Sequence, residues 1–160
     1  MRFNENLETA MEHYSKTGAF LTVNDGTATN TMTVSWGFIG YMWRKPYFIT
    51  VVRPTRYTFK IIEKAEDFTI SLPFGTMKEE LNICGTKSGA DIDKSKVVEF
   101  IPAQTVKSPV VNGCDMFYEC RITYRDVLKK ESVPADVLEK FYNDDLHYVY
   151  FGEIVNCYSK

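Results

Sequence analysis

The sequence has no surplus of positive charge and no long apolar run. Its 160 residues carry a formal net charge of −2, so nothing indicates a surface for nucleic acid or for an anionic membrane. Nowhere do ~18 apolar residues follow one another, and the first residues lack the apolar stretch of a signal peptide. We therefore expect a cytoplasmic protein with neither a membrane nor a nucleic acid as its partner.

Cysteine and histidine are too sparse and too scattered to predict a metal site. Cys84, Cys114, Cys120 and Cys157 form no C-x-x-C pair, and the two histidines lie far from any metal-ligand spacing. We expect reduced thiols, assign no function to Cys84, and predict no metal. The sequence also lacks G-x-G-x-x-G and G-x-S-x-G, which argues against a dinucleotide-binding Rossmann fold and a serine hydrolase.

Strand patterns outnumber helix patterns along the sequence. The length suits a single domain over residues 1–160. The turn signal at residues 24–26 predicts a hairpin. Strands are predicted over residues 19–23, 29–40, 46–52, 67–73, 97–106, 109–111, 116–128 and 147–158, and helices over 5–16, 55–66, 76–84 and 134–142. This order predicts a mainly β fold, an antiparallel split barrel with short flanking helices.

Helix boundaries are predicted from local signals. Asn4 is placed to cap the first helix and Gly18 to end it. Thr76 and Glu79 have capping-box spacing, and Pro134 suits the first turn of the last helix. The Asp144-Asp145 pair that follows this helix predicts a solvated turn.

The stretch VVRPTRYTFKII, residues 51–62, places two arginines and two threonines where a strand ends and a helix begins. Free backbone N–H groups and the helix dipole favour an anion at such a junction. Arg53, Arg56, Thr55 and Thr58 could therefore surround a phosphate, since the guanidinium matches phosphate oxygens two at a time. The alternative is that Thr55 only caps the helix and both arginines lie in solvent.

The stretch NTMTVSW, residues 30–36, has two chemically different faces. Thr33 and Ser35 alternate with Met32, Val34 and Trp36. Hydroxyl and backbone donors beside an apolar surface would suit a flat heteroaromatic ring with acceptors on its edge. An ordinary amphipathic barrel strand would show the same pattern.

The stretch CGTKSGADIDK, residues 84–94, has the composition of a loop. Its lysines, Lys87 and Lys94, could reach an anion, and its glycines allow close backbone approach. A mobile surface loop is the alternative interpretation. His147 opens the last strand among aromatic residues, where a histidine is more often structural than catalytic.

Taken in order, NTMTVSWG, KPYF, VRPTRYTFKII, FTISLP, CGTKSGADIDK and HYVYFGEIV resemble the flavin reductase-like family with the FMN-binding split barrel, in its flavoredoxin-like branch. The resemblance covers roughly residues 18–155. It implies a homodimer that holds one FMN per subunit near the dimer interface. It places Arg53, Thr55, Arg56, Thr58 and Lys94 around the phosphate, and Asn30, Met32, Thr33, Val34, Ser35 and Trp36 along the ring and ribityl chain.

The same resemblance makes His147 a candidate to lie near the flavin or its electron donor. One departure is Ala90, where the family often has an arginine. The implied function is an FMN-dependent oxidoreductase, either an NAD(P)H:flavin reductase or a flavoredoxin-like electron carrier supplied by NAD(P)H or a redox protein. The alternatives are an enzyme similar to pyridoxamine-phosphate oxidase, and a non-catalytic FMN-binding or storage module.

Overall fold

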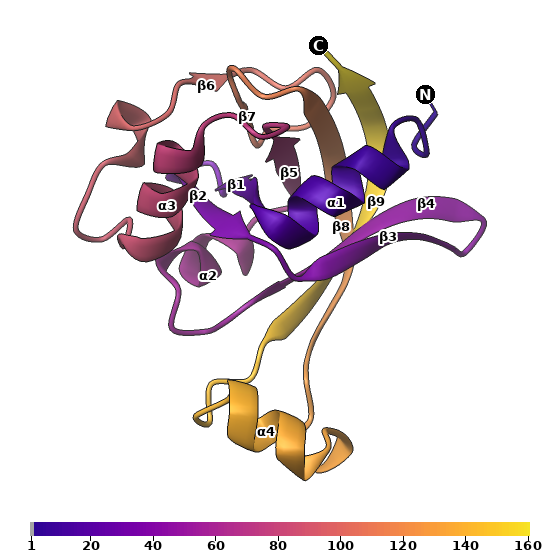
Figure 1. The fold of residues 1–160 in the computed structure, drawn as a ribbon, viewed down its shortest axis with the longest axis vertical. Coiled ribbons are helices and arrows are strands. Elements are labelled where there is room, and N and C mark those ends of the chain that lie inside the picture. The colour runs from indigo at the N-terminus through magenta and orange to yellow at the C-terminus, as the bar shows by residue number, and fades with distance from the viewer. Residues whose placement is uncertain (1) are drawn as a thin grey trace.

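A seven-stranded antiparallel sheet dominates the computed structural model, which describes residues 2–160 (Figure 1). Its strands are β1 (Ala19–Asn24), β2 (Thr29–Val34), β3 (Gly37–Met42), β4 (Lys45–Val52), β5 (Asp67–Leu72), β8 (Met116–Val127) and β9 (Tyr148–Ser159). Two short strands, β6 (Phe100–Ile101) and β7 (Val110–Val111), pair separately. The helices are α1 (Leu7–Lys16), α2 (Tyr57–Ile62), α3 (Lys78–Thr86) and α4 (Ala135–Phe141), with 3₁₀ turns at Lys94–Lys96 and Lys130–Ser132.

The two edges of this sheet are consecutive in the chain. The strand order is β2-β1-β5-β8-β9-β4-β3, and only Ser35 and Trp36 separate β2 from β3. The sheet must therefore curl until its edges come close, although they do not pair with each other. This arrangement confirms the prediction of a mainly β split barrel. It corrects the prediction of one strand over residues 29–40, because β2 pairs with β1 whereas β3 pairs with β4.

Helix α1 lies beside the point where the chain passes from one edge to the other. The buried Tyr14 donates a hydrogen bond to the carbonyl of Trp36 at 2.8 Å, and its ring packs edge-on against Phe48. Gly37 has a φ of +151°, and a Cβ there would lie 2.1 Å from the carbonyl oxygen of Ile49. A glycine is therefore required where β3 begins.

Apolar side chains of the strands fill the interior of the barrel. Phe48, Phe68, Ile70, Tyr118 and Tyr150 are fully buried there. A second cluster lies under α3 and includes Phe20, Leu81, Val110, Val111 and Phe117. All four cysteines are buried and free. None of the helices within residues 2–160 is both long and apolar enough to cross a bilayer.

Long-range contacts shorten two of the predicted elements. The helix predicted over 55–66 ends at Ile62, and Arg125 of β8 binds the carbonyls of Glu63 and Ala65 that follow it. The strand predicted over 97–106 is limited to β6, because the buried carboxylate of Glu119 accepts the backbone N–H groups of residues 104 and 105. Both partners lie too far along the chain for local patterns to reveal them.

The predicted helix caps are only partly present. Asn4 does not cap α1, which begins after Asn6 with no side-chain cap bond. Thr76 and Glu79 form no capping box, since Met77 precedes α3 in a left-handed conformation. Gly18 does end the first helix, with a φ of +86° and its N–H bonded to the carbonyl of His13. Residue 134 lies one position before α4.

The β8–β9 hairpin extends beyond the barrel and carries α4 at its end (Figure 1). No residue of α4 is buried. The chain returns from this projecting arm through residues 141–147, which come back to the barrel just before β9 begins. We call residues 141–147 the return segment.

Candidate functional site

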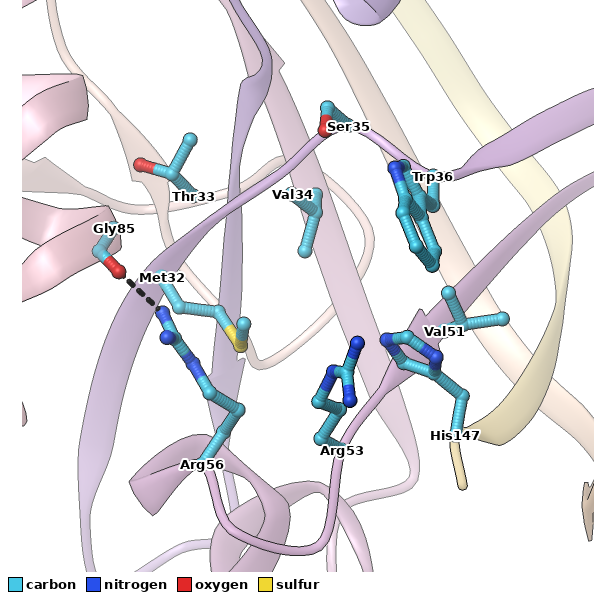
Figure 2. Close-up of a pocket in the computed structure, with 10 residues that line it drawn as sticks. All are labelled: Met32, Thr33, Val34, Ser35, Trp36, Val51, Arg53, Arg56, Gly85 and His147. Carbon is cyan, nitrogen blue, oxygen red and sulfur yellow. Dashed lines mark hydrogen bonds between the residues drawn. The ribbon is translucent and has the colours of Figure 1, made fainter. Parts of the chain in front are cut away.

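Two adjoining cavities lie where the end of β4, the start of α2, the strand β2 and the end of α3 meet. The larger has a volume of about 220 Å³ and the smaller of about 110 Å³, and they share Met32 and Arg56. The larger cavity is lined by Met32, Thr33, Val34, Ser35, Trp36, Val51, Arg53, Arg56, Gly85 and His147 (Figure 2). The smaller is lined by Asn30, Met32, Thr55, Arg56, Tyr57, Thr58, Thr86, Lys87, Ser88, Gly89 and Lys94.

The structure therefore brings every residue of the predicted site to one of these two cavities. The predicted ring-binding residues line the larger cavity, apart from Asn30, which lines the smaller one. The predicted phosphate-binding residues line the smaller cavity, apart from Arg53, which lines the larger one.

The smaller cavity contains two partly or fully buried cations. Lys94 is 4% exposed, and its Nζ donates to the carbonyls of Thr31 and Cys84 at 2.8 Å each. Arg56 donates from Nη2 to the carbonyl of Gly85, also at 2.8 Å (Figure 2). Burial lowers the pKa of both groups, and their mutual repulsion lowers it further for Lys94. Neither forms an ion pair with any carboxylate of residues 2–160.

Hydroxyl and amide groups lie beside these cations. The side chain of Asn30 donates to Thr58 Oγ1 at 2.8 Å, and both residues are buried. The loop after α3 comes close to this pair, because a Cβ on Gly89 would lie 2.5 Å from Asn30 Oδ1 and 2.6 Å from Cδ1 of Tyr57. The glycine thus closes one side of the smaller cavity.

Thr55 lines the smaller cavity without capping a helix. Helix α2 begins at Tyr57 and is six residues long, and Arg56 precedes it with no side-chain cap bond. The alternative interpretation, in which Thr55 only caps this helix, is therefore wrong. The turn before the helix is closed by the N–H of Arg56, which donates to the carbonyl of Arg53.

The larger cavity has an apolar wall and an aromatic end. Met32, Val34 and Val51 line it, and Trp36 is 43% exposed beside them. The Thr33 hydroxyl is already bonded to the carbonyl of Leu81, so this predicted donor is used to hold α3 on β2. The neighbouring Ser35 has no such partner among the hydrogen bonds of the described chain.

Arg53 is bound by the return segment. Its Nη1 donates to both carboxylate oxygens of Asp145 at 2.8 Å, and its Nη2 donates to the carbonyl of Phe141 at 2.8 Å. The guanidinium also lies 5.0 Å from the ring centroid of Tyr142. The prediction of a solvated turn at Asp144-Asp145 is wrong for Asp145, whose pKa is lowered chiefly by its hydrogen bond to Arg53.

His147 is buried against the aromatic end of the larger cavity. Its ring centroid lies 5.2 Å from that of Trp36, and its Nδ1 lies 2.9 Å from the hydroxyl of Tyr142. The pKa of His147 is lowered from 6.5 to about 4, chiefly by burial and then by the charge of Arg53, against a smaller opposite effect of Asp145. The imidazole is therefore neutral near pH 7.

Several residues of the site were not predicted. Tyr57, Gly85, Ser88 and Gly89 complete the smaller cavity or its rim, and Asp145 determines where Arg53 points. The glycines and Ser88 lie within the stretch CGTKSGADIDK, so its composition gave a signal, although Gly85 belongs to the last turn of α3. Nothing in the local sequence indicates the contact between Asp145 and Arg53.

The chain is similar in sequence to one protein family and to proteins of known sequence. The family model described as "Flavin reductase like domain" matches residues 11–160. An uncharacterized protein of Pyrococcus abyssi is 30% identical over 98 residues, which is 61% of this chain and 56% of that protein. The chain thus spans little more than half the length of this relative.

Solved structures show the same fold. A flavoredoxin from Methanosarcina acetivorans superposes with a TM-score of 0.71 at 24% identity, covering 89% of this chain and 68% of that one. An NADH:FAD oxidoreductase from Streptomyces globisporus gives a TM-score of 0.69 at 15% identity, with 90% of this chain and 76% of that one covered.

Proposed function

The chain belongs to the flavin reductase-like domain family, and we propose that it is an oxidoreductase that binds FMN in the two adjoining cavities. Membership of the family supports a flavin-linked oxidoreductase. The finer proposal is a flavin reductase or a flavoredoxin-like electron carrier, acting as a single FMN-binding domain over residues 1–160 and taking electrons from NAD(P)H or from a redox protein.

The observation that carries this proposal is that Arg56 and Lys94, two cations of the smaller cavity, have no carboxylate partner within residues 2–160. Holding Arg56 and Lys94 close together without an acid costs free energy, through both desolvation and mutual repulsion. A dianionic phosphate would remove that cost, because it accepts hydrogen bonds from both groups. We propose that Thr55, Thr58 and Ser88 supply the remaining donors around this phosphate.

The larger cavity suits a flat ring that continues from such a phosphate. Its apolar wall is formed by Met32, Val34 and Val51, and the ring edge would meet the backbone and the hydroxyl of Ser35. The smaller cavity has a volume of about 110 Å³. This size favours a terminal monophosphate over the adenosine diphosphate portion of FAD. We therefore propose FMN as the cofactor.

Bound FMN would supply the hydride and electron-transfer chemistry. The chain would hold the phosphate, present donors to the ring and keep the aromatic end of the cavity dry. His147 would contribute a neutral imidazole beside the ring, and no side chain of the cavity is assigned as a general base.

We also propose a homodimer that is formed through the outer face of β3, β4, β9 and β8. Phe38, Ile49, Phe151 and Tyr124 are successive cross-strand neighbours and so share one face. Phe38 is 56% exposed and Tyr124 is 42% exposed. Such a continuous apolar row supports an interface between subunits. Light scattering on the purified protein should give twice the chain mass.

The experiment that tests the proposed function is an anaerobic titration of the FMN-loaded protein with NADH and with NADPH. The oxidised flavin absorbance should fall with at least one donor. FMN binding without bleaching by either nucleotide or by a reduced redox protein would indicate a binding or storage module. Formation of pyridoxal phosphate from pyridoxamine phosphate would indicate the other alternative, and a failure to bind FMN would contradict the proposal as a whole.

A further inference from the structure

Arg53 was expected to bind the phosphate, yet its side chain forms hydrogen bonds only with the return segment within residues 2–160. Two of them reach the carboxylate of Asp145 and one reaches the carbonyl of Phe141, each at 2.8 Å. The side chains of Arg53 and Asp145 are only 26% and 22% exposed. A phosphate that bound Nη1 of Arg53 would have to compete with the Asp145 carboxylate for this nitrogen.

The return segment is also the part of the projecting arm that contacts the larger cavity. Phe141 packs edge-on against Trp36 with ring centroids 5.4 Å apart, and His147 lies 5.2 Å from the same indole. Tyr142 connects the two ends, because its ring lies under the Arg53 guanidinium and its hydroxyl bonds to His147. The rest of α4, residues 135–140, has no buried residue that could fix the arm.

From these contacts the structure assigns Arg53 and Asp145 a joint role as positioning residues. They hold Phe141 and His147 against Trp36, while Tyr142 contacts both Arg53 and His147. These contacts shape the aromatic end of the larger cavity, where Figure 2 shows Trp36, Arg53 and His147. The effect of this positioning on flavin binding rests on the proposed function. The positioning of the return segment itself can be measured in the flavin-free protein. It leaves Arg56 and Lys94 as the cations for the phosphate.

The inference separates two effects of removing Arg53. If Arg53 acts through the return segment, its loss disturbs the ring-binding end of the larger cavity. The affinity for riboflavin then falls as much as the affinity for FMN. The loss of Asp145 then gives the same defect, and the double variant is no worse than either single one. If Arg53 binds the phosphate instead, its loss affects FMN alone and the loss of Asp145 is harmless.

The first measurement uses the flavin-free protein with Trp43→Phe, in which Trp36 is the remaining tryptophan. Acrylamide quenching of Trp36 should rise by a similar factor, about two, in Arg53→Ala, Asp145→Asn and the double variant, because each frees the same packed segment. Lys130→Ala is the matched control, since it breaks the exposed Lys130–Asp144 pair on the same arm and should leave quenching unchanged. Unchanged quenching in Asp145→Asn would overturn the inference.

The second measurement compares the dissociation constants of FMN and riboflavin. Both should rise about tenfold in Arg53→Ala and in Asp145→Asn, as expected when a charge-assisted contact that orders the site is lost. A loss for FMN alone in Arg53→Ala, with Asp145→Asn unaffected, would overturn the inference. If Arg53→Ala fails to fold, Arg53→Lys and Asp145→Asn carry the comparison. If the parent protein binds neither flavin, the proposed function fails and the quenching result alone decides the positioning role.

Discussion

Arg56 and Lys94 line the same cavity of about 110 Å³, and neither has a carboxylate partner within the described chain. The chain is slightly acidic overall, so acids are plentiful elsewhere on it. Buried charges are ordinarily paired. We therefore propose that the partner of these two cations is an anionic ligand.

Arg56→Ala should weaken FMN binding more than riboflavin binding. A charge-assisted hydrogen bond contributes about 1.5 to 3 kcal/mol, so the FMN dissociation constant should rise roughly 10- to 100-fold. Riboflavin has no phosphate, so its dissociation constant should change little. Fluorescence titration of both ligands checks this, with Lys60→Ala, an exposed cation on α2, as the control for general loss of charge. Equal losses for the two ligands would show that Arg56 does not serve the phosphate.

Inorganic phosphate should stabilise the flavin-free protein. An ion that binds only the folded state raises its stability by mass action, and here it would also relieve the repulsion between Arg56 and Lys94. Thermal unfolding in phosphate and in chloride at equal ionic strength measures the effect. The difference should shrink in Arg56→Met, because one of the two cations is gone. A phosphate effect of the same size in this variant would mean that the ion acts elsewhere or nonspecifically.

His147 should make the protein less stable in mild acid. Its pKa falls from 6.5 to about 4 on folding, so the unfolded chain binds more protons between these values and the free energy of unfolding decreases as the pH falls from 6.5 toward 4. The loss is about 3 kcal/mol at most, at 1.36 kcal/mol per pKa unit. His147→Asn should lose less stability over this interval than the parent protein. Denaturant unfolding across the interval measures both, and parallel curves would argue against the buried neutral imidazole.

Gly89→Ala should impair the smaller cavity. The added Cβ would lie 2.5 Å from Asn30 Oδ1 and 2.6 Å from Tyr57, so the loop must move away from both. We expect a loss of about 1 to 3 kcal/mol in stability, as for other overpacked sites, together with weaker FMN binding. Gly40→Ala is the control, since nothing lies within 4 Å of a Cβ at that position. If the two variants behave alike, the close approach of the loop has no consequence for the site.

The sequence predicted much of the sheet, because strand patterns are local. Alternation in NTMTVSW and the apolar run before Arg53 mark strands that the structure contains. The site residues that the resemblance to the flavin reductase-like family implied all line one of the two cavities, and their roles there remain predictions. Local chemistry also predicted the end of α1 at Gly18.

Contacts between distant residues account for what the sequence did not reveal. Arg53 and Asp145 are 92 positions apart, so no window of sequence shows that this arginine is already paired. The same holds for Arg125 beyond the end of α2 and for Glu119 under the loop at residues 104–105. In each case a charged side chain binds backbone or a counter-charge that only the folded sheet brings near.

The most direct test of the account is the affinity of the flavin-free protein for FMN, riboflavin and FAD, measured by calorimetric titration under identical conditions. The account predicts that FMN binds at least about tenfold more tightly than riboflavin, which lacks the charge-assisted phosphate contacts, and more tightly than FAD. Equal affinity for FMN and riboflavin, or no binding of FMN, would contradict the assignment of Arg56 and Lys94 to its phosphate.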